Sequence, residues 1–167
     1  MSTSSPATDR RRLLRIYLND HLMGAEVGIR VAGRCLDNNR GGPLGTFLQD
    51  LQTEITEDRD ALKDLMDAME FPVDRVKVAA GIVAERIGRL KLNGRLTGYS
   101  DLSRLEELEG LHAGVNAKLR LWKSLQRVAS ADPHIEPETI ERLIGRAESQ
   151  LERLEEHRLQ AAERALG

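Results

Sequence analysis

Residues 13–36 read LLRIYLNDHLMGAEVGIRVAGRCL and carry apolar side chains at intervals of three and four residues. An α-helix has about 3.6 residues per turn, so this spacing places those side chains along one face of a helix. The stripe on that face consists of Leu14, Leu18, His21, Leu22, Ala25, Ile29, Ala32 and Leu36. Because one helix cannot bury such a stripe by itself, the pattern predicts that this segment packs against other helices.

Helical spacing recurs along the rest of the chain, and almost no segment alternates as a strand would. Between turns rich in Gly, Pro, Asn and Asp, the apolar stripes predict helices over 9–37, 43–70, 73–92, 101–129 and from 137 onward. We therefore expect an all-α fold, an antiparallel four-helix bundle with an additional short crossover helix at 73–92. A single domain should span 9–166, after a disordered N-terminal tail at 1–8.

The lengths of the connections indicate how the predicted helices are arranged. The turns at 38–42 and 130–136 are short, so each should join two antiparallel neighbours. The segment 73–99 is long enough to travel the length of the bundle, so the helices before and after it should run in the same direction. A single crossover of this kind occurs in ferritin-like bundles.

Three blocks of the sequence are similar to a known group of proteins. They are YLNDHLMGAEVGIRVAGR (17–34), EITEDRDAL (54–62) and LKLNGRLTGYSDLSRLEELEGL (90–111). These blocks resemble an uncharacterised bacterial family of the ferritin-like superfamily, and the resemblance covers roughly residues 13–165. It implies the ferritin-like bundle fold, whereas the activity has to be argued from the site residues, because one fold hosts many functions.

The composition argues against several classes of protein. The 167 residues include 25 Lys and Arg against 27 Asp and Glu, and this balance disfavours a nucleic-acid-binding surface spread over the protein. No run approaches the ~20 apolar residues of a membrane span, and the N-terminus lacks the apolar centre of a signal peptide. The single cysteine, Cys35, cannot form an internal disulfide and is expected to be a small core residue. We expect a cytoplasmic protein.

A di-iron bundle binds its metal ions through one Glu from each of two helices and through a Glu-x-x-His motif from each of the other two. The chain has one such motif, Glu109-x-x-His112. Glu26, Glu54 and Glu155 lie at about the same depth, but at about 100° per residue they point toward the edges of their stripes. The candidate ligands, for iron or manganese, are Asp58, Glu109, His112, Glu54 and His21.

Some polar residues point directly at the predicted core, namely His21, Asp58, His112 and Arg158. An unpaired carboxylate in a core costs several kcal/mol, so Asp58 must find a partner. The partner could be His21, Arg59, Arg158 or a bound cation. Two interpretations stay open: a structural network of hydrogen bonds and ion pairs, or a metal site that includes Asp58 and His112.

A basic cluster also lies beside the Gly-rich turn NGRLTGYS at 93–100; its members are Arg86, Arg89, Lys91 and Arg95. Backbone amides in this turn, together with the start of the following helix, could bind an anion or a phosphate. The alternative is a solvated helix end whose cations interact favourably with the helix dipole.

The sequence favours a ferritin-like bundle protein that lacks a complete di-iron ligand set and has a non-catalytic, stress-linked or protein-interaction role. The alternative is a metal-binding oxidoreductase or iron-handling protein with an unorthodox carboxylate and histidine site. We also expect a homodimer, because apolar residues widen the first stripe beyond one core face. These residues are Leu13, Tyr17, Val31 and Cys35.

Overall fold

The computed structural model describes residues 6–76 and 98–167. In these ranges the chain forms four long α-helices: α1 (Pro6–Asn38), α2 (Gly42–Ala68), α4 (Asp101–Val128) and α5 (Pro137–Leu166). A single 3₁₀ turn, Ala129–Ala131, follows α4. The all-α class is therefore confirmed for the described part of the chain. The predicted helix at 73–92, apart from its first four residues, and the basic cluster at 86–95 lie outside the described residues.

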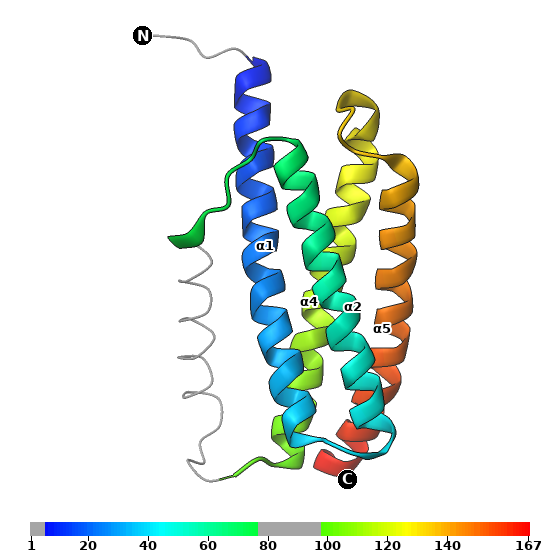
Figure 1. The fold of residues 1–167 in the computed structure, drawn as a ribbon. Helices are drawn as coiled ribbons and strands as arrows, with labels where there is room; N and C mark the ends of the chain where they lie inside the picture. The colour runs from blue at the N-terminus through cyan, green and yellow to red at the C-terminus, as the bar shows by residue number, and fades with distance from the viewer. Residues whose placement is uncertain (1–5, 77–97) are drawn as a thin grey trace.

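The four helices form two antiparallel hairpins that lie side by side (Figure 1). In the first hairpin α1 packs on α2, and in the second α4 packs on α5. The hairpins meet where α1 packs on α4 and where α2 packs on α5. Figure 1 shows that α2 and α4 run in the same direction, as the connection lengths predicted, and that α2 ends at the end of the bundle opposite to the start of α4.

Two helix boundaries differ from the predicted ones. The first helix begins at Pro6 and not at residue 9. Residues 6–8 therefore belong to the helix and not to the predicted disordered tail at 1–8. Proline suits the first turn of a helix, because its missing N–H would have no partner there. The second helix ends at Ala68, two residues early, because Glu70 adopts a left-handed conformation with φ of 56°.

The other boundaries follow the predicted turn chemistry. Ser100 caps α4 by accepting a hydrogen bond from the backbone N–H of Ser103 at 3.1 Å. Pro137 opens α5, and Gly41 and Gly42 at the start of α2 both have positive φ. The turn before α2 is also tight, since a Cβ on Gly45 would come within 2.6 Å of the Asn39 carbonyl oxygen.

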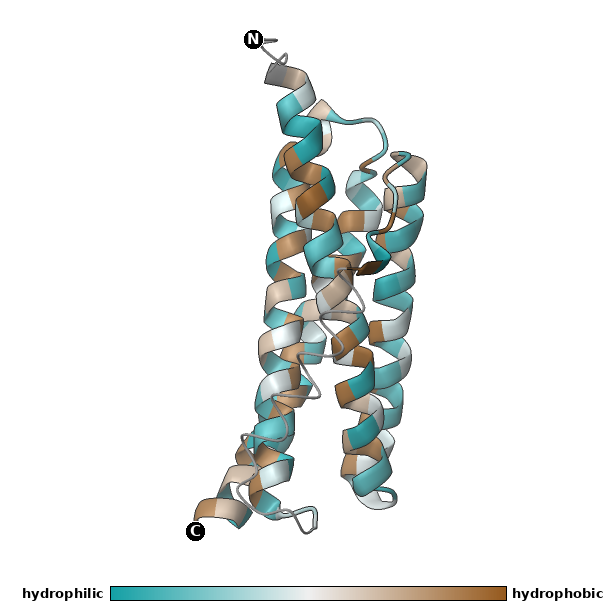
Figure 2. Ribbon diagram, turned by 90° about the vertical axis from the view of Figure 1, so that its left-hand side faces the viewer, coloured by the Kyte–Doolittle hydropathy of each residue, from teal (hydrophilic) through white to brown (hydrophobic). Residues whose placement is uncertain are grey.

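The core is built from aliphatic side chains of all four helices, and polar and apolar residues alternate along each helix (Figure 2). In α1, Leu18, Leu22 and Ala32 are at most 1% exposed, as the first stripe predicts. Between them, Ala25 and Ile29 are only half-buried. The middle of α1 is therefore less closely covered than its two flanks.

A polar network ties the end of α1 to the start of α4. Tyr99 donates a hydrogen bond from its hydroxyl to Glu107 at 3.0 Å and accepts one from the Asn39 side chain at 2.8 Å. Arg34 pairs with the same Glu107 carboxylate at 2.5 Å. Cys35 is fully buried beside this network, and its burial raises the thiol pKa to about 12. The expectation that Cys35 is a core residue is confirmed.

Candidate functional site

Asp58, in the middle of α2, is the most deeply buried acidic side chain among the described residues, with 1% exposed. Its Oδ2 accepts hydrogen bonds from the Lys118 ammonium and, at 3.2 Å, from the side-chain amide of Gln150. Its Oδ1 forms an ion pair with Nη2 of Arg146. Lys118 also donates to Gln150 Oε1 at 2.5 Å. These four residues, here called the Asp58 cluster, join α2 to α4 and α5.

The prediction of a buried polar network around Asp58 is confirmed, but its protein partners are not the predicted His21, Arg59 and Arg158. Arg158 lies eight residues beyond Gln150 on α5, which is about 12 Å further along the helix axis. It pairs with Glu155 at 2.6 Å. His21 instead packs edge-on against the ring of Tyr17, with ring centroids 4.6 Å apart.

Cations outnumber anions inside the Asp58 cluster. Its one carboxylate faces two cationic side chains, Lys118 and Arg146, of which 15% and 21% are exposed. Burial lowers the pKa of Lys118, while the neighbouring Asp58 carboxylate opposes that shift. Glu57, at 2.6 Å from Arg146, supplies a second negative charge from the exposed side of α2. The two cations are thus matched by one buried carboxylate, Asp58, and one exposed carboxylate, Glu57.

Three buried polar atoms in and beside the cluster, two donors and one acceptor, have no hydrogen bond among the described residues. The indole Nε1 of Trp122 and Nε of Arg146 are buried without a hydrogen-bond acceptor among the described residues. Asp58 Oδ1 touches the Arg146 guanidinium but receives no well-directed hydrogen bond from it. Buried polar groups are normally satisfied, so this concentration of unpaired donors needs an explanation.

The predicted metal ligands are not brought together. Glu54 pairs with Arg153 at 2.6 Å, and Glu109 lies 3.7 Å from Arg158. His112 Nε2 lies 3.9 Å from Glu155, whose carboxylate is held by Arg158. Over residues 6–76 and 98–167, no group of three or more His, Cys, Asp or Glu side chains is placed to hold a metal ion.

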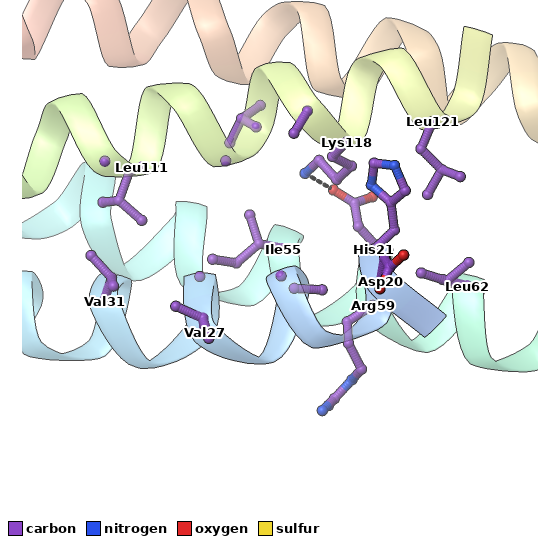
Figure 3. A pocket seen from close by; sticks show the side chains of 18 of the residues that line it. Asp20, His21, Val27, Val31, Ile55, Arg59, Leu62, Leu111, Lys118 and Leu121 are labelled. Carbon is purple, nitrogen blue, oxygen red and sulfur yellow. Dashed lines mark hydrogen bonds and ion pairs between the residues drawn. The ribbon is translucent and has the colours of Figure 1, made fainter. Parts of the chain in front are cut away.

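A cavity of about 430 Å³ lies between α1, α2 and α4, next to the Asp58 cluster. Figure 3 shows that Val27, Val31 and Leu111 line one end of it, and that His21 and Lys118 line the other. Four glycines contribute to its wall, two from α1 and two from α4: Gly24, Gly28, Gly110 and Gly114. A Cβ added at any of these positions would meet no atom of the described residues within 4 Å.

Two members of the Asp58 cluster, Lys118 and Gln150, carry a signal in the sequence that was not among the predictions. Lys118 follows Val115 by three residues and precedes Trp122 by four, so it lies in the apolar stripe of α4. Gln150 lies in the stripe of α5 between Ala147 and Leu154 by the same spacing. A lysine or glutamine in an apolar stripe predicts a buried polar group in the same way as an aspartate does.

Comparison with known proteins gives no further guidance, because no family model, no curated protein and no solved structure matches this chain. In the described ranges, the helices all fall short of the length of continuous apolar sequence that a membrane crossing requires. The function must therefore be inferred from the side chains and the cavity.

Substitution of Asp58 tests the importance of the cluster. In Asp58→Ala two buried cations lose their carboxylate, so we expect a loss of about 3–5 kcal/mol in the free energy of unfolding. The matched control is Asp64→Ala on the exposed side of α2, which should change it by less than about 0.5 kcal/mol. Urea denaturation measures both, and equal effects would contradict the structural role of Asp58.

The two half-buried histidines predict a pH dependence of stability. Burial lowers the pKa of His21 and of His157 in the folded protein, against weaker opposing effects of Asp20 and Glu156. The unfolded chain therefore binds more protons below about pH 6.5, and stability falls as the pH falls through this range. Melting temperatures at about pH 7.5 and 5.5 should differ less in the His21→Gln, His157→Gln double variant than in the parent. An unchanged difference would contradict this origin.

Proposed function

We propose that the protein is a ferritin-like bundle that works without metal chemistry, as a non-catalytic interaction or stress-linked protein. The ferritin-like assignment is supported by the order of two hairpins and by the shared direction of α2 and α4. The resemblance of residues 17–34, 54–62 and 90–111 to that superfamily agrees with this topology.

One observation carries the proposal: the acidic side chains of the expected metal layer are paired with resident cations. Asp58 faces Lys118 and Arg146, Glu54 faces Arg153, and Glu26 is bound by Arg59 at 2.7 Å. A divalent metal needs carboxylates that can turn toward it, and it is repelled by the ammonium and guanidinium groups already present. These residues therefore resemble an internal ion-pair network more than an iron site.

The alternative function, an iron- or manganese-binding oxidoreductase or iron-handling protein, rests on one place in the bundle. There Glu109 and His112 lie one turn apart on α4, and Glu155 of α5 approaches the imidazole. Arg158 would have to leave both Glu155 and Glu109 before these residues could bind a cation. For this reason the alternative is less favoured.

Iron loading separates the two proposals. We expect that the purified protein, mixed anaerobically with iron(II) and desalted, retains well below one iron per chain by elemental analysis. EDTA should also leave its melting temperature unchanged, because resident ion pairs and not a metal hold the bundle. Retention of about two irons per chain with an oxo-bridge absorption band would instead favour the alternative. Manganese(II) loading is the parallel measurement.

We further propose that the protein forms a homodimer through the N-terminal part of α1. Leu13 and Ile16 there are 58% and 39% exposed. Of the other residues expected to widen the stripe, Tyr17 is half-buried, Cys35 is fully buried and Val31 lines the cavity. The apolar surface offered to a partner is therefore shifted toward the start of α1.

Light scattering tests the dimer. We expect twice the monomer mass at micromolar concentration, and a monomer for the Leu13→Glu, Ile16→Glu double variant, because buried unpaired carboxylates are costly. Leu159→Glu, at a 49% exposed position of α5, is the control and should leave the dimer intact. A monomer mass for the parent protein would exclude the homodimer.

A further inference from the structure

The cavity between α1, α2 and α4 is amphipathic along its length. At one end its wall consists of aliphatic side chains, including Val27, Val31 and Leu111 (Figure 3). At the other end lie the Lys118 ammonium, hydrogen-bonded to Asp58, and the His21 imidazole, with the Asp20 and Arg59 side chains beside them (Figure 3). Its volume of about 430 Å³ lies within the usual range of small-molecule sites, ~300–1,000 Å³.

The apolar end of the cavity is kept open by residues that are unfavourable for a helix. Glycine inside a helix costs about 1 kcal/mol relative to alanine. Gly24 and Gly28 on α1, and Gly110 and Gly114 on α4, have no atom of the described residues within 4 Å of the place where a Cβ would stand, and Gly24, Gly110 and Gly114 are exposed. Within residues 6–76 and 98–167, no close approach of a backbone or side chain demands glycine at these four positions. What the four glycines provide in common is room in the cavity.

Hydrogen-bond donors without acceptors lie at the polar end. Trp122, 1% exposed, lines the cavity and has no acceptor for its Nε1–H among the described residues. Lys118, one turn earlier on α4, has three N–H donors, of which Asp58 and Gln150 take two. Among the described residues, Asp58 is the buried carboxylate of this end, and Lys118 shares it with Arg146, which also pairs with Glu57. A ligand that suits this end must bring hydrogen-bond acceptors for the Trp122 N–H and for the third N–H of Lys118.

We propose that this cavity binds an amphipathic monocarboxylate, with its apolar chain between α1 and α4 and its carboxylate at Lys118 and Trp122. The carboxylate accepts hydrogen bonds from the Trp122 N–H and from the third N–H of Lys118. The chain lies along the bare glycine surfaces, which favour a narrow aliphatic group. A cationic amphiphile would meet Lys118 and leave the indole N–H unpaired.

Binding can be followed directly, because Trp122 is the only tryptophan of the chain. Decanoate, added to the full-length protein below its micelle-forming concentration, should change the emission of Trp122 with saturation at one equivalent, and calorimetry should give the same stoichiometry. Decylamine has the same chain length with the opposite charge and should bind at least about tenfold more weakly. Absence of saturable decanoate binding, or equal binding of decylamine, would overturn the proposal.

Filling the cavity tests where the ligand binds. Gly28→Leu and Gly114→Leu each place a side chain in the open space, and each removes an unfavourable helix glycine, so both variants should fold. We expect each to weaken decanoate binding by about tenfold or more. Gly145→Leu is the matched control, since Gly145 is exposed on α5 outside the cavity, and it should leave the affinity unchanged. Equal affinities in all three variants would place the ligand elsewhere and overturn the proposal.

The polar end is tested by calorimetry with Trp122→Phe and Lys118→Met. Trp122→Phe removes the indole N–H but keeps an aromatic ring, and it should weaken decanoate binding while leaving 1-decanol binding less affected. Lys118→Met should reduce the preference for decanoate over decylamine. If Lys118→Met does not fold, Trp122→Phe and the glycine variants still decide the outcome. An undiminished decanoate preference in Trp122→Phe would overturn the assignment of the carboxylate position.

Discussion

The buried carboxylate of Asp58 is the interaction on which the rest of this bundle depends. Most contacts in a four-helix bundle are aliphatic and can slide along one another at small cost. Asp58 cannot slide, because Lys118 on α4 and Arg146 on α5 must each meet it at a fixed depth. Gln150 adds a third point at the same level. The register of α2 against the second hairpin is thus fixed by charge, since any shift would leave buried cations unpaired.

The same electrostatic arrangement determines what chemistry the interior can support. Arg146 and Arg153, which stabilise Asp58 and Glu54, occupy the positions that a metal ion would need in order to bind these two carboxylates. The sequence does not distinguish a carboxylate that binds a metal from a carboxylate that pairs with a guanidinium group. The two kinds of carboxylate differ in whether a cation lies at the same depth on the neighbouring helix, as Arg146 and Arg153 do here. In this bundle the charged side chains of the interior pair with one another across helices, and these pairs hold the helices together.

Much of the architecture was predictable from the sequence, because helix periodicity and caps are local properties. The stripe of 13–36 and the turns before 101 and 137 each predicted the helix that the structure shows. The partners of Asp58 were not predictable to the same degree, because they depend on the axial offset between α2 and α5. Twelve residues, which is about three helical turns, separate Arg158 from Arg146, and no local pattern encodes that offset. The cavity was also missed, since paired glycines have no side chains whose pattern could be read.

Those glycines have a mechanical consequence for the two helices that carry them. Gly24 and Gly28 lie near the middle of α1, and Gly110 and Gly114 in the first half of α4, so backbone amides there lack the cover that side chains give elsewhere. Each glycine also leaves the unfolded backbone more freedom to lose on folding. Helices usually open first at their ends, where hydrogen bonds are fewest. Here α1 contains an additional weak region near its centre, so that its two halves can bend relative to each other where the cavity lies.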